Sequence, residues 1–249
     1  MITFSVRAWS AWAPGVESSE DWMQWARAPA VLPLEGSPEL KFIPAMQRRR
    51  FSRLSRMALQ VAFDVTPPEL QADACSVFAS RHGESNACVA LLTDIARAMP
   101  LSPTAFSHSV HNTQGGQFSI AAGNGRPSSS IAAGTSTFCA GLIEAAAMCE
   151  RHRPRPTLLV VADEPPPEIL RDGDDELPAA FALALLLDVD VHPPAPAFRM
   201  ELVAAPERSA KPAPRLPQAL EFLAWMIAGE GKLALPFEDG SWTFQRLVH

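Results

Sequence analysis

Apolar and polar side chains alternate along the first dozen residues, and several of them are β-branched or aromatic. This pattern predicts an opening β-strand that a Pro-Gly pair ends. Ser18 and Ser19 each offer an N-cap for the helix expected next, and acidic residues occupy its first turn, where the helix dipole favours them. Trp22 and Trp25 share one face of that helix, so we expect both of them in the core.

In the next part of the chain, the spacing of apolar residues predicts a helix, then a strand and then a second helix. Apolar residues at helical spacing between Arg48 and Phe63, with arginines on the other side, predict an amphipathic helix. The apolar run from Cys75 to Ser80 predicts a buried strand. In the helix expected after that strand, four apolar side chains are predicted to point inward: Leu91, Leu92, Ile95 and Met99.

Later patterns continue the alternation of strands and helices. The predicted elements are a helix from Gln114 to Ala122, a strand-like run from Ser130 to Ala133, a strand from Thr157 to Ala162, a core strand or buried helix from Ala179 to Val189, a strand from Phe198 to Val203, a helix that Gly229 ends, and a last strand over SWTFQRLV. Together they predict a layered α/β sandwich whose sites lie at strand-to-helix turns.

Length and composition narrow the class of protein. The 249 residues are expected to form one domain, 1–249, with a proline-rich variable region near 192–217. A hydrophobic content of 47% is enough for a buried core and excludes disorder of the whole chain. The net charge of -6, with both signs scattered, argues against nucleic acid as a partner.

Targeting and cofactor signals are missing from the sequence. No segment reaches the roughly twenty apolar residues that cross a bilayer. The first residues lack a basic stretch followed by a long apolar one, so we do not expect them to act as a signal peptide. The glycines of the chain lack the strand, spacing and lysine of a phosphate loop. The four cysteines (Cys75, Cys88, Cys139 and Cys149) form no CxxC pair, which argues against disulfides and zinc. We expect a soluble cytoplasmic protein with no metal and no cofactor.

A run of basic residues, RRRFSRLSR, stands out against the acidic balance of the chain. One interpretation is a solvated basic face on the amphipathic helix. The alternative is a surface that binds an acidic carrier protein or a partner subunit. Either role would fall to the same five side chains: Arg48, Arg49, Arg50, Arg53 and Arg56.

The stretch PSSSIAAGTSTFCAGLIEAA predicts a sharp strand-to-helix turn. Gly134 permits the turn, and a helix beginning near Thr135 would offer free N–H groups and a dipole that lower the pKa of a thiol. Cys139 lies about one turn further on, where the dipole effect fades. Its helical spacing to Leu142 and Ile143 describes a buried face. We therefore favour a buried Cys139 over a nucleophile.

A nucleophilic cysteine also needs a base, and the segment FSHSVHNTQGG offers one. His111 next to Asn112 could form part of a Cys-His-Asn site, although adjacency in sequence does not establish triad geometry. Alternatively, Ser107, His111 and Asn112 could satisfy buried backbone groups of a loop. Both interpretations remain open at this stage.

The segment from Leu101 to Ala146 resembles the central signature of small β-ketoacyl-synthase-like proteins of aryl polyene pathways, which are related to the chain-length factors of ketosynthase pairs. The blocks SPTAFSHSVHN and SIAAGTSTF carry most of the resemblance. Weaker matches lie at residues 43–59, 77–85 and 158–167. The resemblance implies a thiolase-like α/β/α fold, truncated relative to a full ketosynthase.

The same resemblance implies that this chain is not catalytic alone. It places Thr135, or at most Gly134, where an active ketosynthase carries the cysteine that takes the acyl chain, and Cys139 does not align with that position. After Val189 the sequence has no motif like those that carry the two catalytic histidines. An unassisted alcohol such as that of Thr135 is a poor replacement for a thiol.

The implied function is a chain-length-factor-like subunit that forms a heterodimer with an active ketosynthase and works with an acyl carrier protein. The expected elbow or tunnel residues are Ser107, His111, Asn112, Gly134, Thr135 and Ser136, and the expected interface is Ser128, Ser129, Ser130, Ile131 and Ala132. Two alternatives remain: an acyltransferase or thioesterase using Cys139 with His111, and a carrier-binding module using the five arginines.

Overall fold

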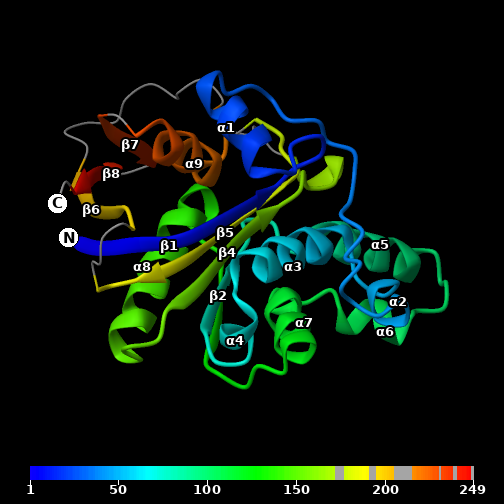
Figure 1. Cartoon of the computed structure of the whole chain (residues 1–249). Helices are drawn as coiled ribbons and strands as arrows, with labels where there is room; N and C mark the ends of the chain where they lie inside the picture. Colours follow the sequence, from blue (N-terminus) through cyan, green and yellow to red (C-terminus); the bar gives the residue numbers. More distant parts are fainter. Residues whose placement is uncertain (172–176, 191–194, 205–214, 230, 238–239, 248–249) are drawn as a thin grey trace.

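One mixed β-sheet organises the molecule (Figure 1). The structure, a computed structural model, describes residues 1–171, 177–190, 195–204, 215–229, 231–237 and 240–247. Within them the sheet has eight strands in the order β3-β2-β4-β5-β1-β6-β8-β7. The strands are β1 (Ile2–Trp12), β2 (Cys75–Ala79), β3 (Ser128–Ile131), β4 (Thr157–Asp163), β5 (Phe181–Asp188), β6 (Ala197–Ala204), β7 (Lys232–Phe237) and β8 (Gly240–Leu247). β2 pairs in parallel with β3 and β4, and the other pairs are antiparallel.

Helices cover both faces of this sheet, which is the layered α/β architecture that the sequence predicts. The helices are α1 (Ser19–Arg27), α2 (Ala45–Arg48), α3 (Arg53–Val65), α4 (Pro68–Gln71), α5 (Ser85–Ala96), α6 (Pro103–Ser107), α7 (Thr113–Ala122), α8 (Thr137–Arg151) and α9 (Gln218–Ala228). Figure 1 shows α3 and α7 on one face, and α8 and α9 on the other, where α1 packs against α9.

The central strands are buried on both faces. Leu159 of β4 and Leu185 of β5 belong to the core beneath α8 and α9. Leu158, Val160 and Ala184 point the other way, into the core beneath α3 and α7. A strand covered on both faces has no polar side, which explains why its sequence is a continuous apolar run. The run from Ala179 to Val189 is therefore a core strand, one of the two predicted alternatives.

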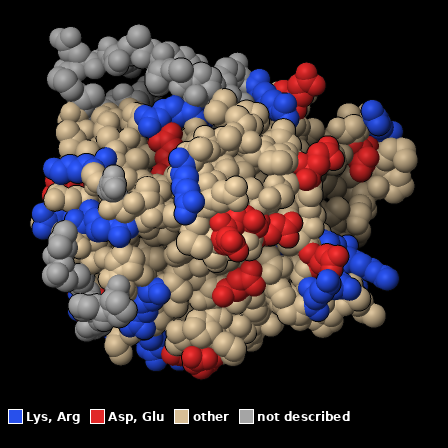
Figure 2. Space-filling model, turned by 45° about the horizontal axis from the view of Figure 1, so that its top comes forward, with Lys and Arg blue, Asp and Glu red and all other residues tan. Residues whose placement is uncertain are grey.

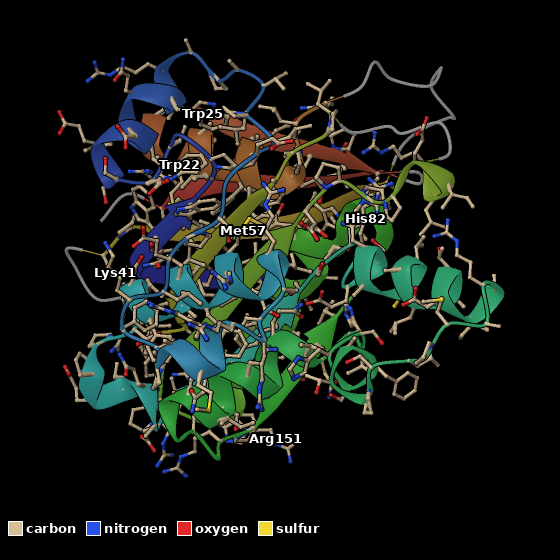
Figure 3. The ribbon with its side chains drawn as sticks, turned by 90° about the vertical axis from the view of Figure 1, so that its right-hand side faces the viewer. Trp22, Trp25, Lys41, Met57, His82 and Arg151 are labelled. Atoms are coloured by element: carbon tan, nitrogen blue, oxygen red, sulfur yellow. The ribbon has the colours of Figure 1, made fainter. Side chains whose placement is uncertain are left out.

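The N-terminal prediction is confirmed except at Trp25, which is half-buried at the border of the core. Ser18 caps α1, and its side chain and that of Asp21 bond reciprocally to the backbone in a capping box. Trp22 is fully buried, and its Nε1 donates to the carbonyl of Ala11 at 2.8 Å. Trp25 packs edge-on against it with ring centroids 5.2 Å apart (Figure 3). The tryptophan pair therefore joins α1 to the end of β1.

The single helix expected between Arg48 and Phe63 is wrong at its start. α2 ends at Arg48, and α3 begins only at Arg53. Ser52 adopts an extended conformation between them and accepts a hydrogen bond from the N–H of Ser55 at 3.0 Å, which makes it the N-cap of α3. Arginines fit a helix interior or a loop equally well, so the periodicity did not reveal the break.

The inward face expected for the helix after β2 is also wrong. α5 is present, but of its predicted core residues only Leu91 is buried. Leu92, Ile95 and Met99 are 63%, 57% and 56% exposed. Figure 1 shows α5 and α6 projecting beyond the sheet, so the apolar side of α5 has no layer of this chain to pack against within the described residues.

The C-terminal third agrees with the predictions except for one strand. Gly229 ends α9 with a φ of +78°, and β8 is the expected last strand. The preceding β7 was not predicted. It contains Pro236 and lies at the edge of the sheet, where proline is tolerated. Within the proline-rich region, residues 191–194 and 205–214 lie outside the described residues.

The close approach of α8 to the sheet yields a stability prediction. A Cβ at Gly141 would lie 3.1 Å from Ala79 Cβ and 3.1 Å from Leu159 Cδ1. We expect Gly141→Val to push α8 off the sheet and to lower the free energy of unfolding by about 1–3 kcal/mol in urea titrations.

The matched control is Gly116→Ala in α7, where no heavy atom lies within 4 Å of the added carbon. This change should raise the free energy of unfolding by about 0.5–1 kcal/mol, because alanine loses less backbone entropy than glycine in a helix. A Gly141→Val protein as stable as wild type would contradict the packing described for α8.

Candidate functional site

The turn between β3 and α8 has the expected strand-to-helix geometry. Gly134 adopts a φ of +56°, a left-handed conformation that favours glycine. The N–H of Ala133 donates to Thr137 Oγ1 at 2.9 Å, and that hydroxyl donates to the carbonyl of Gly134 at 2.7 Å. A 3-10 turn, Gly134–Ser136, precedes α8. The α-helix therefore begins at Thr137, later than expected, and Thr135 lies in the turn ahead of it.

Thr135 has no group at hand to activate it. The residue is half-buried, and its hydroxyl takes part in none of the hydrogen bonds among the described residues. At the neighbouring position, Trp242 Nε1 donates to Ser136 Oγ at a long 3.4 Å. An alcohol without a base in hydrogen-bond reach is a poor nucleophile. The elbow therefore has the backbone of a nucleophile site without the corresponding chemistry.

Cys139 lies in the core and not at the elbow surface. Its side chain is fully buried in the cluster that includes Leu142 and Leu159. Burial raises the pKa of the Cys139 thiol well above its usual range. Among the described residues, the thiol makes one polar contact, in which it donates to Gln218 Oε1 at 3.4 Å. The thiol is protonated and inaccessible, as the helical spacing of its neighbours indicated.

His111 lies on the other side of the sheet, and this contradicts the Cys139–His111 pair. The ring packs over Gly83, and it lines a cavity of about 10 Å³ with Phe78 and Val160. Both of those residues belong to the core beneath α3 and α7, whereas Cys139 belongs to the core beneath α8 and α9. The sheet separates the two side chains, so they cannot form a catalytic pair.

The other two loop residues bond locally or not at all. Ser107 is exposed on α6, and its hydroxyl donates to the carbonyl of Thr104 at 3.0 Å. Asn112 is exposed at the N-terminus of α7, where its side chain makes no capping hydrogen bond. Neither side chain bonds to an elbow residue among those described. His111 differs from Ser107 and Asn112 because its side chain enters the interior. Its Nε2 is buried and has no hydrogen-bond partner among the described residues.

A buried carboxyl group that sequence reasoning missed joins three helices. Glu84, 4% exposed, lies at the start of α5. Its Oε1 accepts hydrogen bonds from Ser52 Oγ at 2.7 Å, Ser55 Oγ at 3.2 Å and Gln114 Nε2 at 2.7 Å. Burial raises the pKa of Glu84 in spite of these bonds. Through Glu84, the N-termini of α3 and α5 are held against α7.

A second carboxyl group, that of the half-buried Asp163, lies at the end of β4. It accepts hydrogen bonds from Ser80 Oγ at 2.7 Å and from the N–H groups of Arg81 and His82 at 3.0 Å each. Desolvation raises the pKa of Asp163. Figure 3 shows His82 at the point where the loop after β2 leads into α5. Their positions in the sequence could have pointed to both groups. Asp163 ends the buried strand β4, and Glu84 follows closely after the buried strand β2, so both lie at the carboxyl ends of parallel strands, where sites commonly form.

The run of five arginines divides into two groups. Arg53 donates through Nε to the carbonyl of Gly36 at 2.7 Å, and Arg56 donates to the carbonyl of Arg48 at 2.8 Å, so both hold the preceding segment against α3. Arg48 is half-buried. Arg49 and Arg50 are exposed, and their guanidinium groups take part in no hydrogen bond or ion pair among the described residues. The prediction of one continuous basic face is therefore wrong.

Charges of both signs lie on the face of the molecule that Figure 2 draws. Figure 2 shows acidic and basic side chains interspersed on one face, with acidic residues grouped near its middle. Among the described residues, no three His, Cys, Asp or Glu side chains are placed to hold a metal ion. In the same part of the chain, every helix is too short or too polar to cross a membrane.

Comparison with known families identifies this architecture. The family model described as "Beta-ketoacyl synthase, N-terminal domain" matches residues 22–245. The chain belongs to this family. A comparison with curated proteins finds no match. The fold is therefore thiolase-like, as the sequence signature implied.

Solved structures agree with the family. A ketosynthase (ApeO) in complex with its chain length factor (ApeC) from Xenorhabdus doucetiae matches with a TM-score of 0.82 and 29% identity, over 99% of this chain and 100% of that one. The ishigamide ketosynthase/chain length factor matches with a TM-score of 0.63 and 16% identity, over 80% and 67%. A type II acyl-carrier protein in complex with its ketosynthase (AntDE:AntF) matches with a TM-score of 0.57 and 13% identity, over 83% and 70%.

The burial of Cys139 predicts the reactivity of the thiols in this β-ketoacyl synthase domain. With iodoacetamide at about pH 7.5, we expect the partly exposed Cys88 to be alkylated first and Cys139 to stay unmodified while the protein is folded. Mass spectrometry of the digested protein measures both sites. The control is the denatured protein, in which all four cysteines should react. Rapid labelling of Cys139 in the native state would disprove its assignment to the core.

The Glu84 junction predicts a pH-dependent stability. Since burial raises the pKa of Glu84 in the folded state, its favourable contribution is present at low pH and is lost as the pH rises through that pKa. Glu84→Gln keeps the one oxygen that accepts all three bonds and removes the charge. We expect the variant to match wild type at about pH 4 and to gain stability over it toward about pH 8 in thermal melts.

Exposed Glu69 provides the control for this measurement. Glu69→Gln should leave the difference from wild type independent of pH over the same range. If Glu84→Gln instead loses stability relative to wild type as the pH rises, the carboxylate is stabilised by its donors more than it is destabilised by burial.

Proposed function

We propose that this chain is a non-catalytic, chain-length-factor-like subunit that pairs with an active β-ketoacyl-ACP synthase while a polyene or fatty-acid-type chain is extended. The elbow is the observation that carries the proposal. It keeps the glycine turn ahead of α8 but presents Thr135, a hydroxyl without a base, where the family resemblance implies a cysteine. Buried Cys139 does not replace that cysteine.

The match to the ApeO–ApeC complex supports the same proposal, since it extends over nearly the whole chain. In such a pair the partner would supply the cysteine and histidines, and this subunit would shape the far end of the acyl tunnel. We assign that shaping role to the elbow and to the loop before α7. The residues are Ser107, His111, Asn112, Gly134, Thr135 and Ser136.

The two edges of the sheet differ in a way that favours β3 as the interface. Lys232 and Pro236 lie on β7, and both discourage the pairing of another strand. β3 carries only serines and an isoleucine, without charge or proline. We propose that the partner pairs with this edge through Ser128, Ser129, Ser130, Ile131 and Ala132.

A four-residue strand needs further contacts for a stable interface, because such interfaces usually bury about 800 Å² on each partner. We propose that the α5–α6 arm, residues 85–110, supplies them. Asp94 and Arg97 are the only Asp, Glu, Lys or Arg residues in this range. Its exposed apolar side chains are Leu92, Ile95, Met99, Leu101, Phe106 and Val110. The arm leaves the sheet beside β3, since the N–H of Ser80 donates to the carbonyl of Ile131 at 3.0 Å.

We also propose that residues 1–249 act as one domain in the cytoplasm. Both hydrophobic cores use the same sheet, which supports a single unit. The four cysteines are free, which fits a reducing compartment. An acyl carrier protein is the proposed source of the acyl chain, by analogy with the ketosynthase–carrier complex that shares the fold.

Coexpression with a candidate ketosynthase tests the function directly. We expect the two chains to copurify, and condensing activity on a carrier-bound acyl chain to disappear when this subunit is omitted. A ketosynthase homodimer that is equally active without this chain would overturn the proposal.

The β3 edge can be tested by a proline substitution. The carbonyls of Pro127 and Ile131 accept bonds from the N–H groups of Ser76 and Ser80, so the N–H of Ser130, in the alternate position, points outward. Ser130→Pro removes that N–H and should weaken binding of the ketosynthase by about tenfold or more, since a partner carbonyl loses its donor. Ser130→Ala keeps the N–H and should bind as wild type in the same titration. Equal affinities for both variants would exclude this edge from the interface.

A further inference from the structure

One charged side chain of α8 lies beside the proposed β3 interface. Glu144 is the only Asp, Glu, Lys or Arg residue between Thr137 and Cys149. Its carboxylate is half-buried and accepts a hydrogen bond from Ser129 Oγ at 2.8 Å. Glu144 forms no ion pair among the described residues. A carboxylate in this place opposes any contact that removes it from water without bringing a donor or a positive charge.

The side chains of β3 alternate between the two faces of the sheet. Ser128 points toward α7, since a Cβ at Gly115 would lie 3.2 Å from its Oγ. Ser129 and Ile131 point to the opposite face, where Ser129 bonds to α8 and Ile131 packs against the core beneath that helix. Glu144 therefore lies over the middle of the edge strand, on the α8 side.

Pairing of two identical β3 edges would bring two copies of this carboxylate together. Two identical strands related by a twofold axis run antiparallel. When both copies have α8 on the same side of the joined sheet, the axis passes near the middle of the strand, through Ser129 or Ser130. In the first register the two copies of Ser129 face each other at about 5 Å, and in the second they are diagonal neighbours at about 7–8 Å.

The distance between the two carboxylates follows from this arrangement. Each Glu144 oxygen lies 2.8 Å from its own Ser129 Oγ, so the two carboxylates would be on the order of 10 Å apart or less. The contact would also exclude the water that screens them from each other. Like charges this close raise the free energy of the pair, so Glu144 disfavours a symmetric homodimer at β3.

The basic residues near this edge do not compensate for the repulsion. Arg126, which precedes β3, forms an ion pair with Asp73. Arg151, the one basic residue of α8, lies two turns beyond Glu144, which is about 10 Å along the helix axis. In an antiparallel pair it would point away from the twofold axis. The two carboxylates would therefore meet without a positive charge between them.

We propose that Glu144 sets the choice of partner at the β3 edge. It opposes symmetric pairing of two copies of this chain and favours a ketosynthase whose facing helix brings a hydrogen-bond donor or a positive charge. The inference rests on the proposed function, because the β3 interface is identified through it. It adds a residue that discriminates between partners, which backbone pairing of β3 alone does not do.

The discrimination acts on the symmetric pair alone. A pair shifted by one residue would place the two α8 helices on opposite faces of the joined sheet, so the two Glu144 side chains would not meet. Pairing of the edge with an unrelated extended segment would not bring a second Glu144 at all. Glu144 thus acts at the arrangement that competes most directly with the ketosynthase.

Sedimentation equilibrium of the full chain without ketosynthase tests the repulsion. Glu144→Gln keeps an oxygen that accepts the bond from Ser129 and removes the charge. We expect its homodimer dissociation constant to be at least about tenfold lower than that of wild type at about 100 mM salt. Its affinity for the ketosynthase, measured by titration, should not rise.

Glu150→Gln is the matched control, because it removes the same charge from the same helix. Glu150 accepts a hydrogen bond from Arg153 at 2.6 Å, and Arg153 also bonds to Asp190, which follows β5. β5 is separated from β3 by β2 and β4, so Glu150 lies away from the edge. The control should self-associate within about twofold of wild type.

Charge reversal separates repulsion from a merely structural role of Glu144. Glu144→Lys should repel a second copy of itself and attract the wild-type chain. We expect an equimolar mixture of the two to form a mixed dimer at least about tenfold more tightly than either chain forms a homodimer. A loss of packing at Glu144→Lys would weaken association in the mixture as well.

Two outcomes would overturn the proposal: equal self-association of wild type, Glu144→Gln and Glu150→Gln, or a mixture with Glu144→Lys that associates no better than its components. In either case a wild-type chain that still copurifies with the ketosynthase leaves the proposed function intact. Failure of that copurification removes the proposed function itself.

Discussion

Burial of β4 and β5 on both faces is the constraint on which the other layers depend. Two strands without a polar side require a helical layer above and below, so α3 and α7 must cover one face and α8 and α9 the other. α8 can follow β3 closely only through the glycine turn at Gly134, and it lies close to the sheet because Gly141 has no side chain. The turn at Gly134 therefore forms at the edge of the sheet, beside a strand that has one unpaired side within the described part of the chain.

Features that depend on one element were predictable from the sequence. Ser18 caps α1, Gly229 ends α9, and the apolar run of β4 is a buried strand, because local hydrogen bonds or burial decide each of them. Features that depend on several elements were not predictable. The break before α3 depends on Ser52 acting as an N-cap, and the exposed side of α5 depends on how far that helix extends beyond the sheet.

The candidate site shows the same division. The turn at Gly134 and the burial of Cys139 follow from local sequence, since the glycine precedes hydroxyl residues and the cysteine shares a helix face with Leu142. The separation of His111 from Cys139 could not be read from the chain, because it depends on which face of the sheet each helix covers. Glu84 was missed for a similar reason: its donors come from α3 and α7, distant in sequence.

The unguarded β3 edge affects how the amount of this chain must be regulated. A free copy presents backbone donors and acceptors to any other extended segment, including the β3 edge of another copy, whereas β7 is protected by Lys232 and Pro236. Copies of this chain in excess of the ketosynthase would therefore be prone to pair their β3 edges wrongly and to be degraded. Synthesis in step with the ketosynthase, as from neighbouring genes on one transcript, would keep the concentration of free edges low.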